Sequence, residues 1–189
     1  MTRLSIALVC CLGLSACVSL PGADSSPSAR YTLPASTASC TASEKVLELS
    51  VVAVAPGLDN NRIARVNRDS GKLSYLKGVR WADSSASLVE QRLAADLECA
   101  GYTVSTSHRS NIKHPRLVCE LRAFNLAESR SGGDSAEVAL SCLLSGTDGE
   151  LSLTGSATED VNSWNADAAV AGVGRAYTST LRQISKNLP

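Results

Sequence analysis

The alternation of hydrophobic and polar positions predicts a chain built mainly from strands. Glu44–Ala55 is rich in β-branched residues with partial alternation, which indicates a well-buried strand that stops at Pro56-Gly57. Arg62–Val66 and Leu73–Leu76 flank a turn signal at Ser70-Gly71 and predict a short exposed hairpin.

Three longer strands are predicted in the second half of the chain. Pro115–Ala127, Ala136–Leu144 and Glu150–Ala157 each have a strand-like pattern. Turn signals at Ser131-Gly132-Gly133 and Thr147-Asp148-Gly149 separate them. Together these segments predict a three-stranded antiparallel meander.

Two segments have helical periodicity instead. The first runs from Ser84 to about Cys99, with Asp83 as its N-cap and Gly101 at its end. Tyr102–Ser105 follows as a short strand. The apolar positions of this helix are Ala86, Val89, Leu93, Leu97 and Ala100.

The second predicted helix follows an N-cap at Asn162 or Ser163 and has an Ala/Gly-rich stretch, Ala168–Ala176, that allows close packing. Its apolar positions are Val173, Tyr177, Leu181, Ile184 and Leu188. The order of elements is strand, hairpin, helix, meander, helix. It predicts one α+β domain over residues 44–189, with a mostly antiparallel sheet and both helices packed on one face.

The first sixteen residues have the pattern of a secretory signal. Arg3 precedes an apolar run, residues 4–13, that is too short to span a bilayer as a helix. Leu14-Ser15-Ala16-Cys17 then has the form of a bacterial lipobox, whose cysteine thiol forms a thioether to diacylglycerol. The alternative is an ordinary cleavage site with an incidental cysteine. Small residues directly before the cysteine favour lipidation of Cys17.

A lipidated Cys17 divides the chain into three parts. Residues 1–16 are the signal peptide, and residues 17–43 are the acylated end and a flexible tether. Val18–Arg30 is rich in Ser, Pro and Gly, and spans at most roughly 45 Å when extended. Aspartate directly after the cysteine often retains lipoproteins at the inner membrane. Val18 and Ser19 stand there instead, which favours an outer-membrane anchor facing the periplasm.

The charge balance argues against nucleic acid as a partner, because the chain has 18 basic and 18 acidic residues. One segment departs from this balance. Residues 62–80 contain a single acid, Asp69, among six basic residues: Arg62, Arg65, Arg68, Lys72, Lys77 and Arg80.

Two interpretations of the basic segment stay open. One is a solvated hairpin whose cations protect a strand edge. The other is a docking surface for an acidic protein or for lipid phosphates. Tyr75 and Trp81 interleave with the charges, which is typical of interfaces, although Trp81 also suits the core. The candidate docking residues are Arg62, Arg65, Tyr75, Arg80 and Trp81.

The cysteines that remain after export are Cys40, Cys99, Cys119 and Cys142. The oxidising compartment permits disulfides between them. A hairpin centred near residues 130 and 131 places Cys119 opposite Cys142, which leaves Cys40 for Cys99. Four buried free thiols are the alternative. The sequence has no C-x-x-C pair, so we expect no metal site.

No segment carries a recognisable catalytic or cofactor motif. The two histidines, His108 and His114, share one loop without a nearby acid or nucleophile. Ser74-Tyr75-Leu76-Lys77 matches the S-x-x-K pattern of penicillin-recognising serine enzymes, but it lies on a predicted strand and the accompanying motifs are missing. We therefore expect no enzyme activity and no cofactor.

Three stretches resemble a known family. They are "RYTLP", "VVAVAPGLDNNRIARV" and "LSYLKGVRWADSSASLVEQRLAADLECAGY". Over roughly Tyr31 to Leu188 the chain resembles the ABC-type transport auxiliary lipoproteins, the PqiC-like family. Arg62, Tyr75, Arg80 and Trp81 fall within the most characteristic elements.

The resemblance implies a non-enzymatic lipoprotein that accompanies an ABC transporter permease and ATPase and an MCE-domain protein. In that role it docks or completes a conduit for lipids or other hydrophobic molecules at the outer membrane. Some members form rings, so the resemblance also implies a homo-oligomer. Two other functions stay open: a periplasmic carrier that holds an acyl chain between sheet and helices, and an envelope hydrolase.

Overall fold

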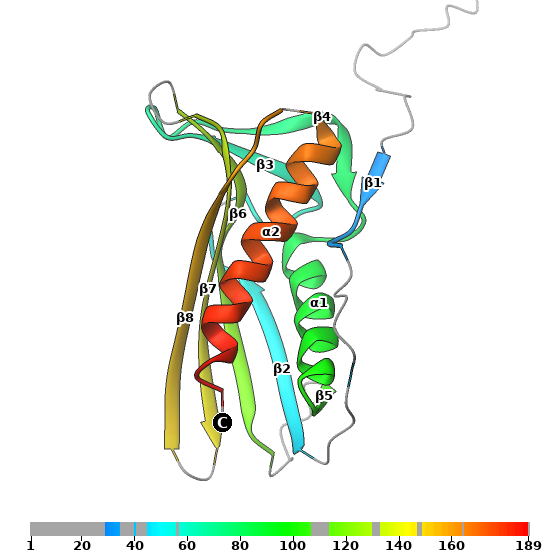
Figure 1. The fold of residues 1–189 in the computed structure, drawn as a ribbon, viewed down its shortest axis with the longest axis vertical. Coiled ribbons are helices and arrows are strands. Elements are labelled where there is room, and N and C mark those ends of the chain that lie inside the picture. Colours follow the sequence, from blue (N-terminus) through cyan, green and yellow to red (C-terminus); the bar gives the residue numbers. More distant parts are fainter. Residues whose placement is uncertain are drawn as a thin grey trace, which may run out of the picture.

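The computed structural model describes residues 29–34, 40, 45–55, 57–106, 114–129, 133–146, 149–163 and 165–188. The signal segment 1–16, Cys17, His108 and most of the two meander turns lie outside these residues. The strands are β1 (Ala29–Tyr31), β2 (Lys45–Ala53), β3 (Arg62–Asn67), β4 (Leu73–Trp81), β5 (Tyr102–Ser105), β6 (Arg116–Glu128), β7 (Ser135–Gly146) and β8 (Gly149–Asp160), and the helices are α1 (Ser85–Cys99) and α2 (Ala166–Ser185) (Figure 1).

The sheet is organised around the long strand β6. Its first half pairs in parallel with β2, and its second half pairs in parallel with β3. β7 pairs with β6 in the antiparallel direction, and β8 does the same with β7. The predicted meander and the α+β class are therefore confirmed. The sheet is mixed, because four of the seven strand pairings among the described residues are parallel and three are antiparallel.

Two smaller arms extend from β6. One consists of β2 and β5. The other consists of β3, its antiparallel partner β4, and β1, which pairs in parallel with β4. The predicted hairpin of residues 62–76 is confirmed, and β4 continues beyond it to Trp81. It is not the exposed hairpin expected, because β3 pairs with β6 and its residues Ile63 and Ala64 are buried.

β1 lies inside the segment expected to be a tether. Its residues Ala29–Tyr31 pair with β4, and Leu33 is buried in the core. The Tyr31 hydroxyl also donates to Asp167 Oδ1 on α2, at 2.9 Å. The folded domain thus begins before residue 44. The sequence did not predict this, because β1 has only three residues and forms by pairing with the edge of β4.

Both helices cover the same face of the sheet (Figure 1), as predicted. α1 packs on β2 and β5, and α2 packs on β6, β7 and β8. The buried residues of α1 include Val89, Leu93 and Leu97, and those of α2 include Val173, Tyr177 and Ile184. The helical periodicity of the sequence therefore identified the core faces, with one correction: Ala100 is the exposed C-cap of α1, and Leu88 is buried instead.

The helix caps differ slightly from the prediction. Ser84, not Asp83, is the N-cap of α1 and accepts from the Ser87 backbone N–H at 3.3 Å. The Asp83 carboxylate instead accepts from the Ser87 hydroxyl and the Ser84 N–H, which lowers its pKa. α2 is capped by Asn165 rather than by residue 162 or 163, and Asn165 accepts from the Ala168 N–H at 2.8 Å.

Glycines allow α2 to approach the sheet closely. A Cβ on Gly155 of β8 would lie 2.6 Å from the Thr180 carbonyl oxygen on α2. A Cβ on Gly172 of α2 would lie 2.7 Å from Val161 Cγ2. At Gly155 the obstacle is the α2 backbone itself, so a larger residue there requires the helix to move; at Gly172 the nearest atom is the end of the Val161 side chain, just after β8.

Gly155→Ala is accordingly expected to lower the free energy of unfolding by about 1–3 kcal/mol, because the backbone of α2 must move away from β8. Urea denaturation measures this change. Gly146→Ala is the matched control, since its Cβ would meet Pro115 at an ordinary 3.7 Å. We expect the control to shift stability by less than about 0.5 kcal/mol. Equal losses in the two variants would contradict the close helix packing.

Both predicted disulfides are present. Cys119 and Cys142 are direct partners in the β6–β7 ladder and are buried. Cys40 is bonded to Cys99 at the end of α1, across a separation of 59 residues. The second bond attaches the segment after β1 to the helical layer.

Candidate docking surface

Three arginines lie side by side on the β1–β4–β3 arm. Arg80 on β4 is the register partner of Arg30 on β1 and of Arg62 on β3. Paired residues of neighbouring strands project from the same face of a sheet. All three side chains are exposed. We call Arg30, Arg62 and Arg80 the arginine row.

Neutral side chains contact two of the three guanidinium groups of the row, those of Arg62 and Arg80. The Arg62 guanidinium carbon lies 3.8 Å from the centre of the Tyr75 ring, within cation–π range. Arg80 Nη1 donates to Asn61 Oδ1 at 3.3 Å. Within the described ranges, no Asp or Glu forms an ion pair with any member of the row. Its positive charge is therefore not compensated there.

Two other arginines of the hairpin, Arg65 and Arg68, form ion pairs with carboxylates of the meander. Arg65 forms an ion pair with Glu128, whose pKa is lowered by hydrogen bonds from Asn67 and Arg65. Arg68 Nε donates to Glu137 Oε1 at 3.0 Å. The expected basic surface is thus less positive than its sequence suggests, and Arg65 holds the arm on β6.

Trp81 does not belong to the surface. Its side chain is 0% exposed and its ring centre lies 5.1 Å from that of Phe124. Consecutive strand residues point to opposite faces, so Arg80 faces outward and Trp81 inward. The candidate docking set therefore loses Trp81 to the core and gains Arg30, which sequence reasoning missed because that residue lay in the expected tether.

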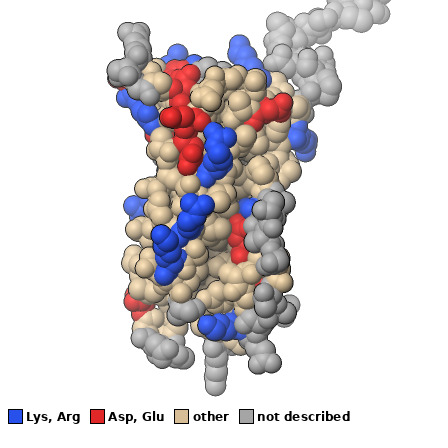
Figure 2. All heavy atoms as spheres, in the orientation of Figure 1, with Lys and Arg blue, Asp and Glu red and all other residues tan. Residues whose placement is uncertain are grey.

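The helix-covered face has a different charge pattern. On the side shown in Figure 2, basic and acidic side chains are interspersed. A mixed surface of this kind produces no large field of one sign. The contrast makes the arginine row the more distinctive electrostatic feature.

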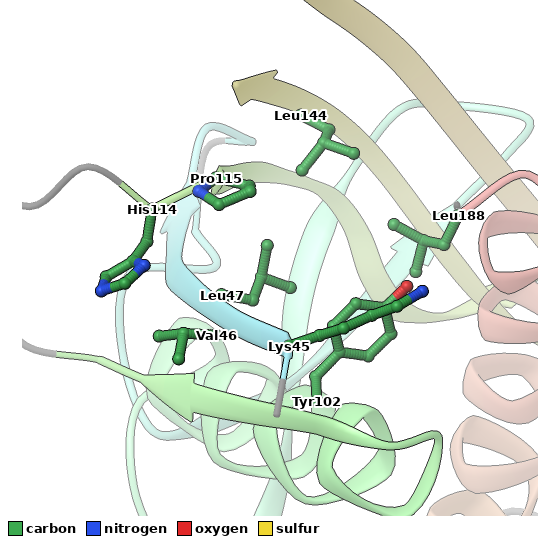
Figure 3. Close-up of a pocket in the computed structure, with 8 residues that line it drawn as sticks. All are labelled: Lys45, Val46, Leu47, Tyr102, His114, Pro115, Leu144 and Leu188. Atoms are coloured by element: carbon green, nitrogen blue, oxygen red, sulfur yellow. The ribbon is translucent and has the colours of Figure 1, made fainter. Parts of the chain in front are cut away.

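An apolar pocket of about 360 Å³ lies where β2 begins and β7 ends, away from β1 (Figures 1 and 3). Figure 3 shows the side chains that line it: Lys45, Val46, Leu47, Tyr102, His114, Pro115, Leu144 and Leu188. The Lys45 ammonium lies 5.9 Å from the centre of the Tyr102 ring. Leu188, predicted as part of the α2 core face, follows the helix. It packs partly buried against the core, as predicted, and also lines this pocket.

Within the residues that the structure describes, Ser74 and His114 are not brought together with a partner for catalysis. Ser74 lies on β4, where its hydroxyl donates to the Arg65 carbonyl oxygen at 3.3 Å, so the S-x-x-K match is part of a strand. His114 is exposed beside the pocket. Among the described residues, no three His, Cys, Asp or Glu side chains are grouped to hold a metal ion.

Of the two helices in the described part of the chain, neither α1 nor α2 is both long and apolar enough to cross a bilayer.

The chain matches a known protein family and the folds of solved structures. A family model described as "ABC-type transport auxiliary lipoprotein component" matches residues 31–185. Among curated proteins, none matches the chain.

Two solved structures share the fold. One is a crystal structure of an uncharacterized protein, 14% identical, with a TM-score of 0.65; the match covers 84% of this chain and 97% of the other. The second is protein XCC0632 from Xanthomonas campestris, of family DUF330, 17% identical, with a TM-score of 0.60; the match covers 83% of this chain and 91% of the other. At these identities the similarity concerns the fold alone.

Proposed function

The chain belongs to the ABC-type transport auxiliary lipoprotein family, and from this premise we propose that it is a non-enzymatic lipoprotein anchored in the outer membrane through Cys17. In this proposal the domain faces the periplasm and docks an MCE-domain protein that works with an ABC transporter permease and ATPase. The assembly completes a conduit for lipids or other hydrophobic molecules. The observation that carries the proposal is the family match over residues 31–185, which spans nearly the whole ordered domain.

The sequence before the domain supports the envelope location. Leu14-Ser15-Ala16-Cys17 has the lipobox form, and β1 begins 12 residues after that cysteine. Of the candidate docking residues, Arg62, Tyr75 and Arg80 remain available as contacts, because Arg65 is paired with Glu128 and Trp81 is buried.

The carrier alternative has less support. It requires room for an acyl chain between the sheet and the helices. At the crossings of Gly155 and Gly172, however, the helix and the sheet are already in contact. These contacts count against an acyl chain under the middle of α2, so a carrier would have to use the apolar pocket of about 360 Å³ at the start of β2.

The proposal is tested by capture of its partners. The full acylated chain, tagged at its C-terminus, is crosslinked in envelopes of the source organism, and the crosslinked proteins are identified by mass spectrometry. We expect the MCE-domain protein, with permease and ATPase, to be enriched over a tagged unrelated lipoprotein. Enrichment of neither the MCE-domain protein nor the permease would refute the proposal.

A further inference from the structure

We propose that the arginine row binds the phosphate groups of anionic phospholipids in the membrane that holds the anchor. The inference rests on the proposed function, because acylation of Cys17 is what brings a bilayer to this surface. It names the partner of Arg30, Arg62 and Arg80, which the family match does not identify.

The first argument is uncompensated charge. Like charges on directly opposed strand positions destabilise a sheet. On the same arm, Arg65 and Arg68 have carboxylate partners from β6 and β7, whereas the arginine row has none among the described residues. An external anion removes this repulsion. Phosphate suits it well, because a guanidinium group donates two parallel N–H bonds to phosphate oxygens.

The second argument is that the row is already positioned. Tyr75 packs on the Arg62 guanidinium, and Asn61 accepts from Arg80. β1, which carries Arg30, is fixed by β4 on one side and by the Tyr31–Asp167 hydrogen bond on the other. Three donors on a fixed β-surface lose little freedom when they bind an array of phosphates.

The third argument is distance from the anchor. Cys17 is 12 residues before Ala29, a length that spans at most roughly 40 Å. Arg30 is the first charged residue after Cys17 among the residues that the structure describes. An acidic protein face is the competing partner, but no described feature of the chain brings such a face to the row, whereas the anchor brings the bilayer.

The test uses the exported chain with Cys17→Ser, which cannot be acylated, so that binding reports the folded surface alone. Sedimentation measures its partitioning onto phosphatidylethanolamine vesicles that contain phosphatidylglycerol, compared with vesicles of phosphatidylcholine alone. We expect binding to the anionic vesicles only, with strong weakening by salt.

The decisive variant combines Arg30→Gln, Arg62→Gln and Arg80→Gln. A basic residue near an anionic membrane contributes about fivefold to binding, so the triple variant is expected to lose about hundredfold. The matched control combines Arg122→Gln, Arg182→Gln and Lys186→Gln, three exposed positions outside the row. Salt screens the interaction between exposed charges beyond about 8 Å, and these three side chains lie outside the row. The control is therefore expected to lose no more than about twofold in binding to the anionic vesicles. Circular dichroism verifies that both triple variants remain folded.

Three results would overturn the inference. They are absence of binding to anionic vesicles, equal losses in the row and control triples, and a lysine triple that loses as much binding as the glutamine triple although it keeps the charge. If the row triple instead abolishes capture of the MCE-domain protein in detergent, where no bilayer is present, the row belongs to a protein interface. None of these results bears on capture by the unaltered acylated chain, so failure of the inference is distinguishable from failure of the proposed function.

Discussion

Replacing Cys17 with serine is expected to move essentially all of the protein from the membrane fraction to the periplasmic fraction. Serine has no thiol to form the thioether that attaches diacylglycerol. A lasting anchor requires two or more acyl chains, and this variant has none. Membrane fractionation followed by immunoblotting measures the change, and intact mass measures the missing lipid.

A double variant within the signal segment serves as the control. Cys10→Ser with Cys11→Ser alters the same residue type but leaves the lipobox intact. We expect this variant to remain with the membrane and to keep the mass of the acylated protein. An unaltered chain that is found without lipid, or an unaltered distribution of the Cys17 variant, would contradict lipidation and with it the proposed location.

Trp81→Ala is expected to lower the free energy of unfolding by about 3–5 kcal/mol. The indole is fully buried against Phe124, where its removal leaves a large cavity. The adjacent Arg80→Ala, which alters an exposed side chain, is expected to change stability by less than about 0.5 kcal/mol. Urea denaturation followed by circular dichroism measures both.

A third variant separates packing from hydrogen bonding at this position. The Trp81 Nε1 atom is buried and has no hydrogen-bond partner among the described residues. Trp81→Phe therefore removes no hydrogen bond and keeps most of the apolar contact, so its loss of stability is expected to be smaller than that of Trp81→Ala. Similar losses in the Ala and Phe variants would indicate that the indole N–H has a partner that holds it in place.

Local patterns predicted the elements whose partners are close in sequence. The meander has short connections, so counting outward from residues 130 and 131 was enough to place Cys119 opposite Cys142. The apolar faces of both helices followed from periodicity, as Leu93 and Tyr177 illustrate. In each case the information lies within one or two adjacent segments.

Pairing between distant segments was not predictable in the same way. Nothing in the sequence of β2 predicts that it pairs with the first half of β6. Likewise, nothing in the sequence of β3 predicts that it pairs with the second half of β6. β1 is a strand only because β4 offers it an edge. Long-range register of this kind depends on the packing of the whole domain.

The same limit applied to the candidate docking surface. Counting charges identified residues 62–80 as basic, but Glu128, the partner of Arg65, lies 63 residues away in the chain. Alternation within β4 left both interpretations of Trp81 open, and burial decided between them. Arg30 joined the arginine row only through register.

The Cys40–Cys99 bond has a mechanical consequence for a protein held by its N-terminus. A pulling force on the anchor would first load the short β1–β4 pairing and then reach Cys40. From there the covalent bond passes the force directly to Cys99, at the end of α1. Residues 41–98, which include β2, β3 and β4, lie inside the closed loop and cannot be stretched. If Cys17 is acylated as we propose, tension from the bilayer would therefore separate β1 from β4 without extending the strands inside the loop.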